Sequence, residues 1–427
     1  MELLHIAAVL LLLAAVFGYV NFRFFKLPST IGLMVVTLVC SVAVLVFDLT
    51  WDQAARLFPA LNLGDLGLRE TIASSLGRVD FSRTLLHGML SFLLFAGALH
   101  VNLEELLQRK WAIGTLATVG VALSMIIVGG LSYGLFGMMG LGVPFIYCLI
   151  FGALISPTDP VAVLGILKST RIPASLEAKI AGESLFNDGV GIVVFIMLTS
   201  MAGLGTHVVE GAGEVSLLFV REVFGGLALG FFTGFAAYSA MKTIDHFQLE
   251  LIITLALVMV INSVAAVLHT SGPIAVVVAG LFIGNHGKRF AMSEITVQHL
   301  EDFWSLMDDI LNAVLFLLIG LELFIIPFES KLLVAALISI PVVLLARFVS
   351  VGIPIALLKV ARRSFSPRVV RILTWSGLRG GISVALVLSL PTFEHKSLLI
   401  ACTYLVVLFS VIVQGMTIAS VVRGGEE

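Results

Sequence analysis

Three carboxylates lie in the middle of two long apolar stretches of this chain. Asp159 stands between Pro157 and Pro160, and Glu183 and Asp188 lie in the next apolar stretch. A charged side chain at the centre of a lipid bilayer costs roughly 2.5 to 3.5 kcal/mol on insertion scales. A chain normally places carboxylates at that depth to bind or move something charged, so these two stretches are the first candidates for a functional site.

Oxygen atoms gather on one face of the second stretch. Glu183 and Asn187 are four residues apart, as are Ser184 and Asp188, so in a helix the four side chains share one broad stripe. Carboxylate, amide and hydroxyl oxygens suit hard cations, which need ligands in place of lost water. Two other interpretations remain: Ser184 could bond back to its own helix, and Asp188 could be an ion-pair partner without a role in transport.

The composition places these stretches in a membrane. Hydrophobic residues make up 59% of the 427 and only 12% are charged, against about 25% in soluble proteins, and the mean hydropathy is +1.11. Apolar runs of about 20 residues recur along the chain, each long enough to cross a hydrocarbon core of roughly 30 Å. We therefore expect an all-α polytopic membrane protein with a single transport domain over residues 1–427.

Other classes of protein are disfavoured. The sequence has no basic cluster, zinc-spaced Cys/His set or phosphate-cradling glycine loop, so we expect no nucleic-acid partner, no cofactor and no enzymatic activity. The three cysteines, Cys40, Cys148 and Cys402, fall inside apolar runs and are expected to be small buried side chains, not disulfide partners.

The apolar runs predict about thirteen transmembrane helices, with ends uncertain by a few residues. They cover about 3–20, 30–48, 83–101, 111–133, 144–167, 178–200, 217–241, 249–268, 272–285, 300–325, 332–358, 368–390 and 397–420. The first run follows Glu2 without a basic segment before it, so we expect a retained helix and not a cleaved signal peptide.

The basic residues predict the orientation. Of the 25 Lys and Arg residues, sixteen lie in loops after odd-numbered spans and seven in loops after even-numbered spans. Basic loops favour the cytoplasm, so we expect the N-terminus outside and the C-terminus inside the plasma (inner) membrane. The remaining two, Arg347 and Arg379, fall within spans 11 and 12. An arginine at that depth needs an acidic partner or a wet cavity, and Glu183, at similar depth, is the expected partner of Arg347. For Arg347 alone, a purely structural ion pair is the alternative.

Two spans carry helix-breaking residues. Pro157 and Pro160 interrupt span 5 around Asp159, and Gly377, Gly380 and Gly381 interrupt span 12 around Arg379. Small residues for tight helix packing are the alternative explanation of the glycines, but not of an arginine among them.

The spacing of the two breaks predicts symmetry. They lie seven crossings apart, so equivalent helices would run in opposite directions, as inverted repeats of spans 1–6 and 8–13 require. Paired unwound helices that cross at the midplane form the substrate site of many secondary transporters. Asp159 could offset two positive helix N-termini there, and Arg379 two negative C-termini.

The residues around both breaks and in span 6 form three long motifs. They are Ser156–Val163 (SPTDPVAV), Gly182–Gly189 (GESLFNDG) and Thr374–Gly381 (TWSGLRGG), and span 9 adds Ser271–Gly280 (SGPIAVVVAG). In combination they resemble the NhaP-type sodium/proton antiporters of the monovalent cation:proton antiporter-1 family, over essentially the whole chain.

The resemblance implies a fold of thirteen helices with inverted repeats that forms a homodimer. Its mobile core would comprise spans 4–6 and 11–13, about residues 111–200 and 332–420. The dimerisation helices would be span 1 and spans 7–10, about residues 3–20 and 217–325.

The resemblance also implies roles for single residues. Asp188 would bind Na+ or the proton, and Asp159, Ser184 and the Thr158 carbonyl would complete the sodium site.

Three supporting residues follow from the same resemblance: Asn187 would be the neutral member of the Asn-Asp pair that accompanies electroneutral exchange, and Glu183 would pair with Arg347. Arg379, the fourth supporting residue, follows from the helix break described above. One position departs from the pattern: Ala96 in span 3 stands where some prokaryotic relatives carry glutamate, so an acidic contact from that span would be missing.

We therefore expect a secondary antiporter that exchanges Na+ (or Li+) for H+ one for one, by alternating access, with cation and proton competing for Asp188. The expected partners are the monovalent cation, the proton, the lipid bilayer and a second copy of the chain. K+/H+ exchange stays open, because selectivity depends on cavity size more than on ligand type. An intramembrane aspartyl protease and a passive channel are remote, because no Gly-x-Gly-Asp precedes either aspartate and no repeated selectivity element occurs.

Overall fold

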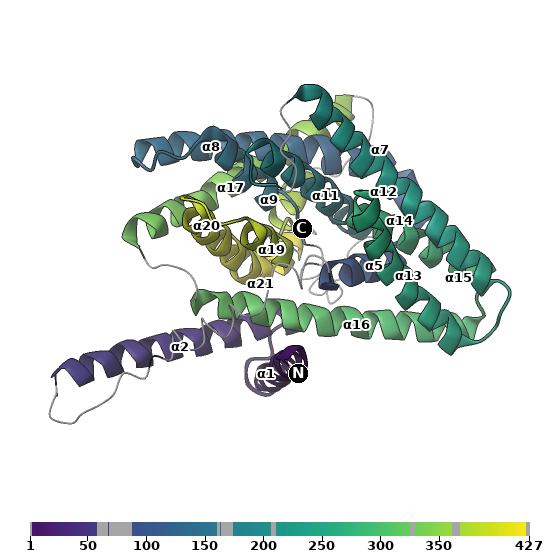
Figure 1. Ribbon diagram of the computed structural model, residues 1–427, viewed down its shortest axis with the longest axis horizontal. Coiled ribbons are helices and arrows are strands. Elements are labelled where there is room, and N and C mark those ends of the chain that lie inside the picture. The colour runs from purple at the N-terminus through teal and green to yellow at the C-terminus, as the bar shows by residue number, and fades with distance from the viewer. Residues whose placement is uncertain are drawn as a thin grey trace.

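The computed structural model describes residues 2–57, 67, 88–159, 163, 174–205, 211–324, 329–360 and 368–423. Within these ranges every regular element is a helix, as the composition predicted (Figure 1). Eight continuous helical stretches of the described residues are long and apolar enough to cross a membrane: Ala7–Phe25, Ser29–Trp51, Lys110–Met138, Lys179–Met201, Gly213–Met241, Phe247–Leu268, Ser330–Val360 and Lys396–Val422. Helices α5 (Leu90–His100) and α9 (Phe145–Ile155) are shorter and apolar.

The remaining helices have the following bounds. The long ones are α1 (Glu2–Val20), α2 (Ser29–Leu57), α8 (Val121–Met138), α11 (Ala174–Met201), α12 (Ala212–Met241), α13 (Phe247–Leu268), α16 (Glu294–Leu321) and α17 (Ser330–Val360). The shorter ones are α6 (Leu103–Gln108), α7 (Lys110–Thr115), α14 (Gly272–Phe282), α15 (Lys288–Phe290), α18 (Val369–Trp375), α19 (Gly381–Ser389), α20 (Lys396–Phe409) and α21 (Gly415–Arg423). Single π turns, η1 (Asn21–Phe25), η4 (Leu116–Gly120), η5 (Ile283–Gly287) and η7 (Ser410–Gln414), and the 3₁₀ turn η6 (Glu322–Phe324) extend or join them.

Each predicted span coincides with a helix or a pair of helices, although parts of spans 3 and 5 lie outside the described residues. The number of crossings and the inverted repeats stay predictions. Helix α16, the predicted tenth span, is not among the eight long apolar stretches. The reason is the part from Glu294 to Ile310, which carries five acidic residues, whereas the part from Leu311 to Leu321 is apolar apart from Asn312.

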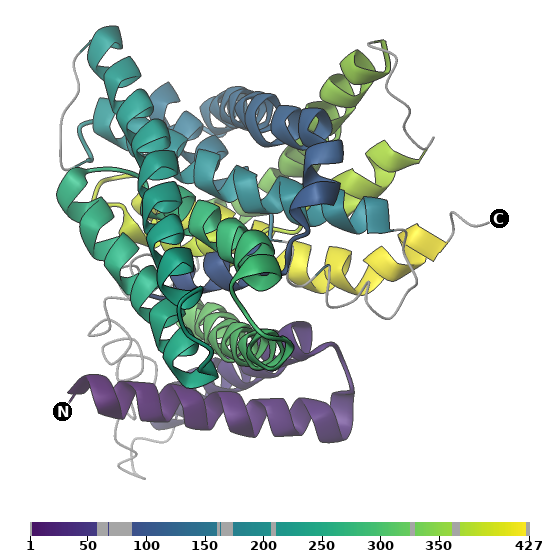
Figure 2. The same ribbon diagram turned by 90° about the vertical axis from the view of Figure 1, so that its right-hand side faces the viewer.

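The helices pack as two groups (Figures 1 and 2). In one group α8 packs against α9 and α17, and α20 against α17 and α19. In the other, α16 packs against α2 and α1, while α14 packs against α12, α13 and α5. Helix α11 contacts both groups, through α9 on one side and through α12, α14 and α5 on the other. The mobile and dimerisation roles of the two groups stay predictions.

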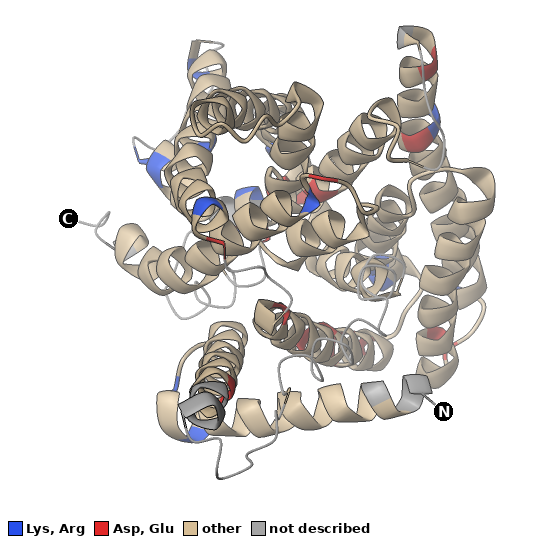
Figure 3. Cartoon of the chain, turned by 60° about the vertical axis from the view of Figure 1, so that its left-hand side comes forward, with Lys and Arg blue, Asp and Glu red and all other residues tan. Residues whose placement is uncertain are grey.

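Charged residues are sparse within these helices, as Figure 3 shows. Most of the ribbon carries neither acidic nor basic residues. The buried charged residues around the first group belong to α11, α17 and the segment between α18 and α19.

Two helices end abruptly in the interior of the first group. Helix α9 ends at Ile155 and the backbone of 156–159 is not helical, because Pro157 has no N–H to donate. Helix α18 ends at Trp375, and residues 377–380 form a non-helical link to α19. The two links touch, since the Asp159 N–H donates to the Leu378 carbonyl at 2.8 Å. Irregular backbone is tolerated at membrane depth where other protein groups hydrogen-bond its N–H and C=O groups. This hydrogen bond satisfies one N–H of the link after α9 and one carbonyl of the link before α19.

Candidate functional site

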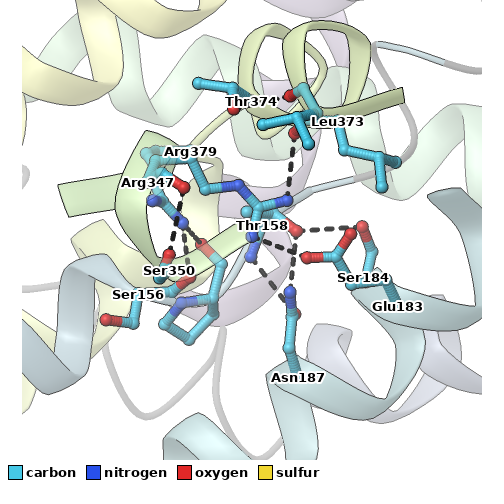
Figure 4. A network of polar contacts seen from close by, with 12 residues as sticks. Ser156, Thr158, Glu183, Ser184, Asn187, Arg347, Ser350, Leu373, Thr374 and Arg379 are labelled. Carbon is cyan, nitrogen blue, oxygen red and sulfur yellow. Dashed lines mark hydrogen bonds and ion pairs between the residues drawn. The ribbon is translucent and has the colours of Figure 1, made fainter. Parts of the chain in front are cut away.

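Arg379 fastens one broken helix to the other (Figure 4). Its guanidinium Nη1 donates to the Pro157 carbonyl at 2.9 Å and to the Ser156 carbonyl, and its backbone N–H donates to Ser410 Oγ at 2.7 Å. The two carbonyls extend from the C-terminal end of α9, where backbone oxygens lack helical partners and carry partial negative charge. A buried cation, 2% exposed, therefore neutralises that end.

Asp159 lies against the start of the opposite half-helix. A Cβ atom added to Gly380 would overlap the Asp159 carboxyl group, so the carboxyl approaches the backbone just before α19 begins at Gly381. The N-terminal end of a helix carries partial positive charge and favours an anion. Only glycine at position 380 leaves room for this approach.

Asn187 and Ser184 of α11 contact Thr158 in the link at 156–159, which follows α9. The Asn187 Nδ2 donates to Thr158 Oγ1 at 2.8 Å, and the Thr158 N–H donates to Asn187 Oδ1 at 3.2 Å. Thr158 Oγ1 also lies 3.0 Å from Ser184 Oγ. All three residues are buried, so this reciprocal pairing satisfies the backbone that Pro157 interrupts.

Asp188 is a buried carboxyl group of the site with an unsatisfied oxygen, and Arg379 beside it has an unsatisfied Nη2. Asp188 is 3% exposed, and its Oδ1 is buried without a hydrogen-bond partner. Its electrostatic neighbours are Asp159 and Arg379. A buried carboxylate oxygen that no protein group satisfies is costly unless it takes up a proton or a cation.

Glu183 and Arg347 form the ion pair that the sequence predicted. Arg347 Nη1 lies 2.6 Å from Glu183 Oε1, and both residues are buried. Arg347 Nη2 also donates to the Leu373 carbonyl at 3.2 Å, near the C-terminal end of α18. Each half-helix that ends in the interior thus has its C-terminal carbonyls neutralised by a separate arginine.

The eight residues singled out in the sequence therefore come together from α11, α17 and the two non-helical links at 156–159 and 377–380. Figure 4 shows six of them: Thr158, Glu183, Ser184, Asn187, Arg347 and Arg379. Their roles toward an ion stay proposals. Ala96 is buried in α5, which packs against α11, and the effect of lacking an acid there stays a prediction. No set of three or more His, Cys, Asp and Glu among the described residues has the arrangement of a metal site.

Several other polar groups of the site could not be predicted from residue types and spacing. Ser410 receives the Arg379 N–H, but it is one of many hydroxyls in apolar spans and nothing in the pattern distinguished it. The carbonyls of Ser156 and Leu373 have no sequence signature at all. Among the described residues, four carboxylic residues outside the site are also buried, and a count of acids within the predicted spans could have found them: Asp48, Glu222, Glu250 and Glu322.

Comparison with known proteins gives a consistent result. The family model described as "Sodium/hydrogen exchanger, transmembrane" matches residues 10–424. The chain is 45% identical over 427 residues to the Na(+)/H(+) antiporter NhaP of Pseudomonas aeruginosa, covering 99% of this chain and 96% of that one. It is 34% identical over 350 residues to the Na(+)/H(+) antiporter NhaH of Halobacillus aidingensis, covering 80% and 83% of the two chains.

A solved structure has the same fold. The sodium proton antiporter MjNhaP1 from Methanocaldococcus jannaschii, determined at pH 8, superposes with a TM-score of 0.74 at 18% identity, covering 100% of this chain and 99% of that one. At this identity the comparison establishes the fold alone.

The Glu183–Arg347 pair predicts a measurable coupling. Glu183→Gln or Arg347→Gln alone leaves the other charge buried without its partner, which should cost about 3 to 5 kcal/mol of stability. The double variant should recover part of that loss, because neither charge remains. Thermal unfolding of the four purified proteins tests this. If the double variant loses the sum of the two single losses, the two side chains do not stabilise each other.

A glycine substitution tests the contact between Asp159 and the second link. Gly380→Ala should lower the unfolding temperature, because the added methyl group overlaps the Asp159 carboxyl and overpacking costs about 1 to 3 kcal/mol. Gly130→Ala in α8 is the matched control, since its Cβ would meet nothing within 4 Å. Equal unfolding temperatures for the two variants would contradict the described approach.

Proposed function

The chain belongs to the family of transmembrane sodium/hydrogen exchangers, and from this premise we propose that it exchanges Na+ (or Li+) for H+ one for one, with both cations competing for Asp188. The observation that carries the proposal is the buried Oδ1 of Asp188, which has no hydrogen-bond partner. A proton bound there satisfies it as O–H, and a sodium ion satisfies it as a ligand. The two occupants exclude each other because they use the same oxygen.

Four protein groups are the proposed sodium ligands. They are the carboxyl groups of Asp188 and Asp159, the Ser184 hydroxyl and the Thr158 carbonyl. The hydrogen bonds of Thr158 to Asn187 and its contact with Ser184 support this assignment, because they fix the link next to Asp188 on α11. A preformed set of oxygens lowers the ordering cost of replacing the hydration shell of the ion.

The balance of buried charge supports a one-for-one exchange. Three carboxyl groups (Asp159, Glu183 and Asp188) face two guanidinium groups (Arg347 and Arg379), and Asn187 is neutral. With all five groups ionised the site carries one negative charge, which a single proton or a single sodium ion neutralises. A neutral site crosses a low-dielectric barrier at lower cost than a charged one, so only the occupied site changes sides.

Alternating exposure follows from movement of one group of helices against the other. We assign the moving part to α7–α11 and α17–α21 and the dimerisation part to α1 and α12–α16, in a homodimer in the plasma membrane with the N-terminus outside. The small set of contacts between α16 and α19 and between α11 and α14 supports a boundary between these parts.

Asp188→Asn should abolish exchange. The substitution keeps the size of the side chain but removes the group that takes up a proton or a cation, so sodium-driven proton movement in proteoliposomes should fall to the level of empty vesicles. Asp245→Asn, at an exposed position before α13, is the matched control and should exchange as the unmodified chain does. Robust exchange by a correctly folded Asp188→Asn protein would end the proposal.

Competition at Asp188 also predicts the kinetics. Near the optimum, raising the proton concentration should raise the apparent KM for Na+ with little change in maximal rate, because the proton occupies the same site. An imposed membrane voltage should leave the rate unchanged when one proton is exchanged for one cation. Initial rates at several pH values and voltages, with Li+ and K+ tested beside Na+, measure both effects. A maximal rate that falls while KM stays constant would exclude simple competition, and a voltage-dependent rate would exclude one-for-one exchange.

A further inference from the structure

The turn between α1 and α2 is held in an unusual shape. Lys26 has a φ of 54°, in the left-handed region that costs a residue other than glycine free energy. Asn21, which is buried, holds the turn in place: its Nδ2 donates to the Leu27 carbonyl at 2.9 Å, and its Oδ1 accepts the Leu27 N–H at 3.2 Å. The Lys26 N–H donates to the Asn21 carbonyl at 2.7 Å. The chain therefore holds Lys26 in one fixed orientation at a local cost.

This turn borders a cavity at the end of α1. The cavity measures about 780 Å³ and lies between the end of α1, the turn, the start of α2 and one turn of α16. Most of its lining is apolar, with Ala14, Gly18, Leu33 and Ala313 among the contributors. Its charged lining residues are Arg23, Lys26 and Asp309, which leave one net positive charge.

Exposed aromatic residues mark the depth of the cavity in the membrane. Phe22, Phe24 and Phe25 are 80%, 71% and 51% exposed, beside Arg23 and Lys26. Exposed phenylalanine rings favour the acyl region of the bilayer, and basic side chains at the end of a span extend to the lipid headgroups. The predicted orientation places this turn at the cytoplasmic leaflet, whose surface is anionic.

We propose that this cavity binds one anionic phospholipid. Arg23 and Lys26 hold the phosphodiester, and the acyl chains lie along the apolar walls of α1 and α2. A singly charged lipid neutralises the net positive charge, whereas a zwitterionic lipid brings no net charge. The proposal concerns a lipid site and is independent of cation exchange.

Native mass spectrometry of the purified chain with phosphatidylglycerol or phosphatidylcholine tests the proposal. The unmodified chain should retain phosphatidylglycerol in preference to phosphatidylcholine. The double variant Arg23→Gln/Lys26→Gln should bind phosphatidylglycerol about 30-fold more weakly, given the usual contribution of two cations near an anionic lipid. Asn21→Ala, which keeps both cations but releases the turn, should weaken binding as well. Soluble glycerol phosphate should not compete, because it lacks the acyl chains.

Lys110→Gln/Lys242→Gln is the matched control, since it removes two exposed cations away from the cavity. This variant should bind phosphatidylglycerol as the unmodified chain does. Equal losses in the two double variants would reduce the effect to overall charge and overturn the proposal. Unchanged binding by Arg23→Gln/Lys26→Gln, or equal retention of the two lipids by the unmodified chain, would overturn it too.

Discussion

The structure depends on the neutralisation of broken helix ends inside a membrane. Helices α9 and α18 both end in the interior, where carbonyl groups without partners are costly. Arg379 donates to the carbonyls that follow α9, and Arg347 donates to a carbonyl of α18. Each arginine then needs negative charge in turn, and α11 supplies it through Glu183 and Asp188. The position of α11 between the two groups of helices follows from this requirement.

Much of this arrangement could be predicted from residue types alone. Pro157 and the glycines of 377–381 cannot maintain a helix, so the breaks at 156–159 and 377–380 were predictable from local chemistry. The partnership of Glu183 with Arg347 followed from their similar depth and opposite charge, because an arginine in a bilayer must be compensated. Helical content was predictable from the length of the apolar runs. In each case the free-energy cost of an unsatisfied backbone group or an uncompensated charge in a bilayer favours the observed arrangement.

Other features could not be predicted, because they depend on packing in three dimensions. Periodicity does not reveal that the Asp159 N–H bonds to the Leu378 carbonyl, or that Ser410 accepts from Arg379, since backbone carbonyls and isolated serines have no distinguishing pattern. The left-handed conformation of Lys26 is equally invisible in the sequence, because the asparagine that maintains it lies five residues earlier, at the start of η1. The acidic part of α16 was included in an apolar span because the part from Leu311 to Leu321 is strongly apolar.

Position 187 connects the architecture of the site to its stoichiometry. Asn187 both donates to the Thr158 hydroxyl and accepts the Thr158 N–H. A carboxylate has nearly the same shape and could accept from both groups of Thr158, so the geometry alone does not require an amide. The charge balance does. An aspartate at 187 would add a second uncompensated negative charge beside Arg379, because both arginines already face carboxyl groups and helix ends. Such a site would need two positive charges to become neutral, whereas the amide leaves a requirement for one. Under the proposed one-for-one exchange, the amide at this position therefore sets how much charge each turnover carries, whereas a carboxylate could still hold the broken helix by accepting from the hydroxyl and the N–H of Thr158.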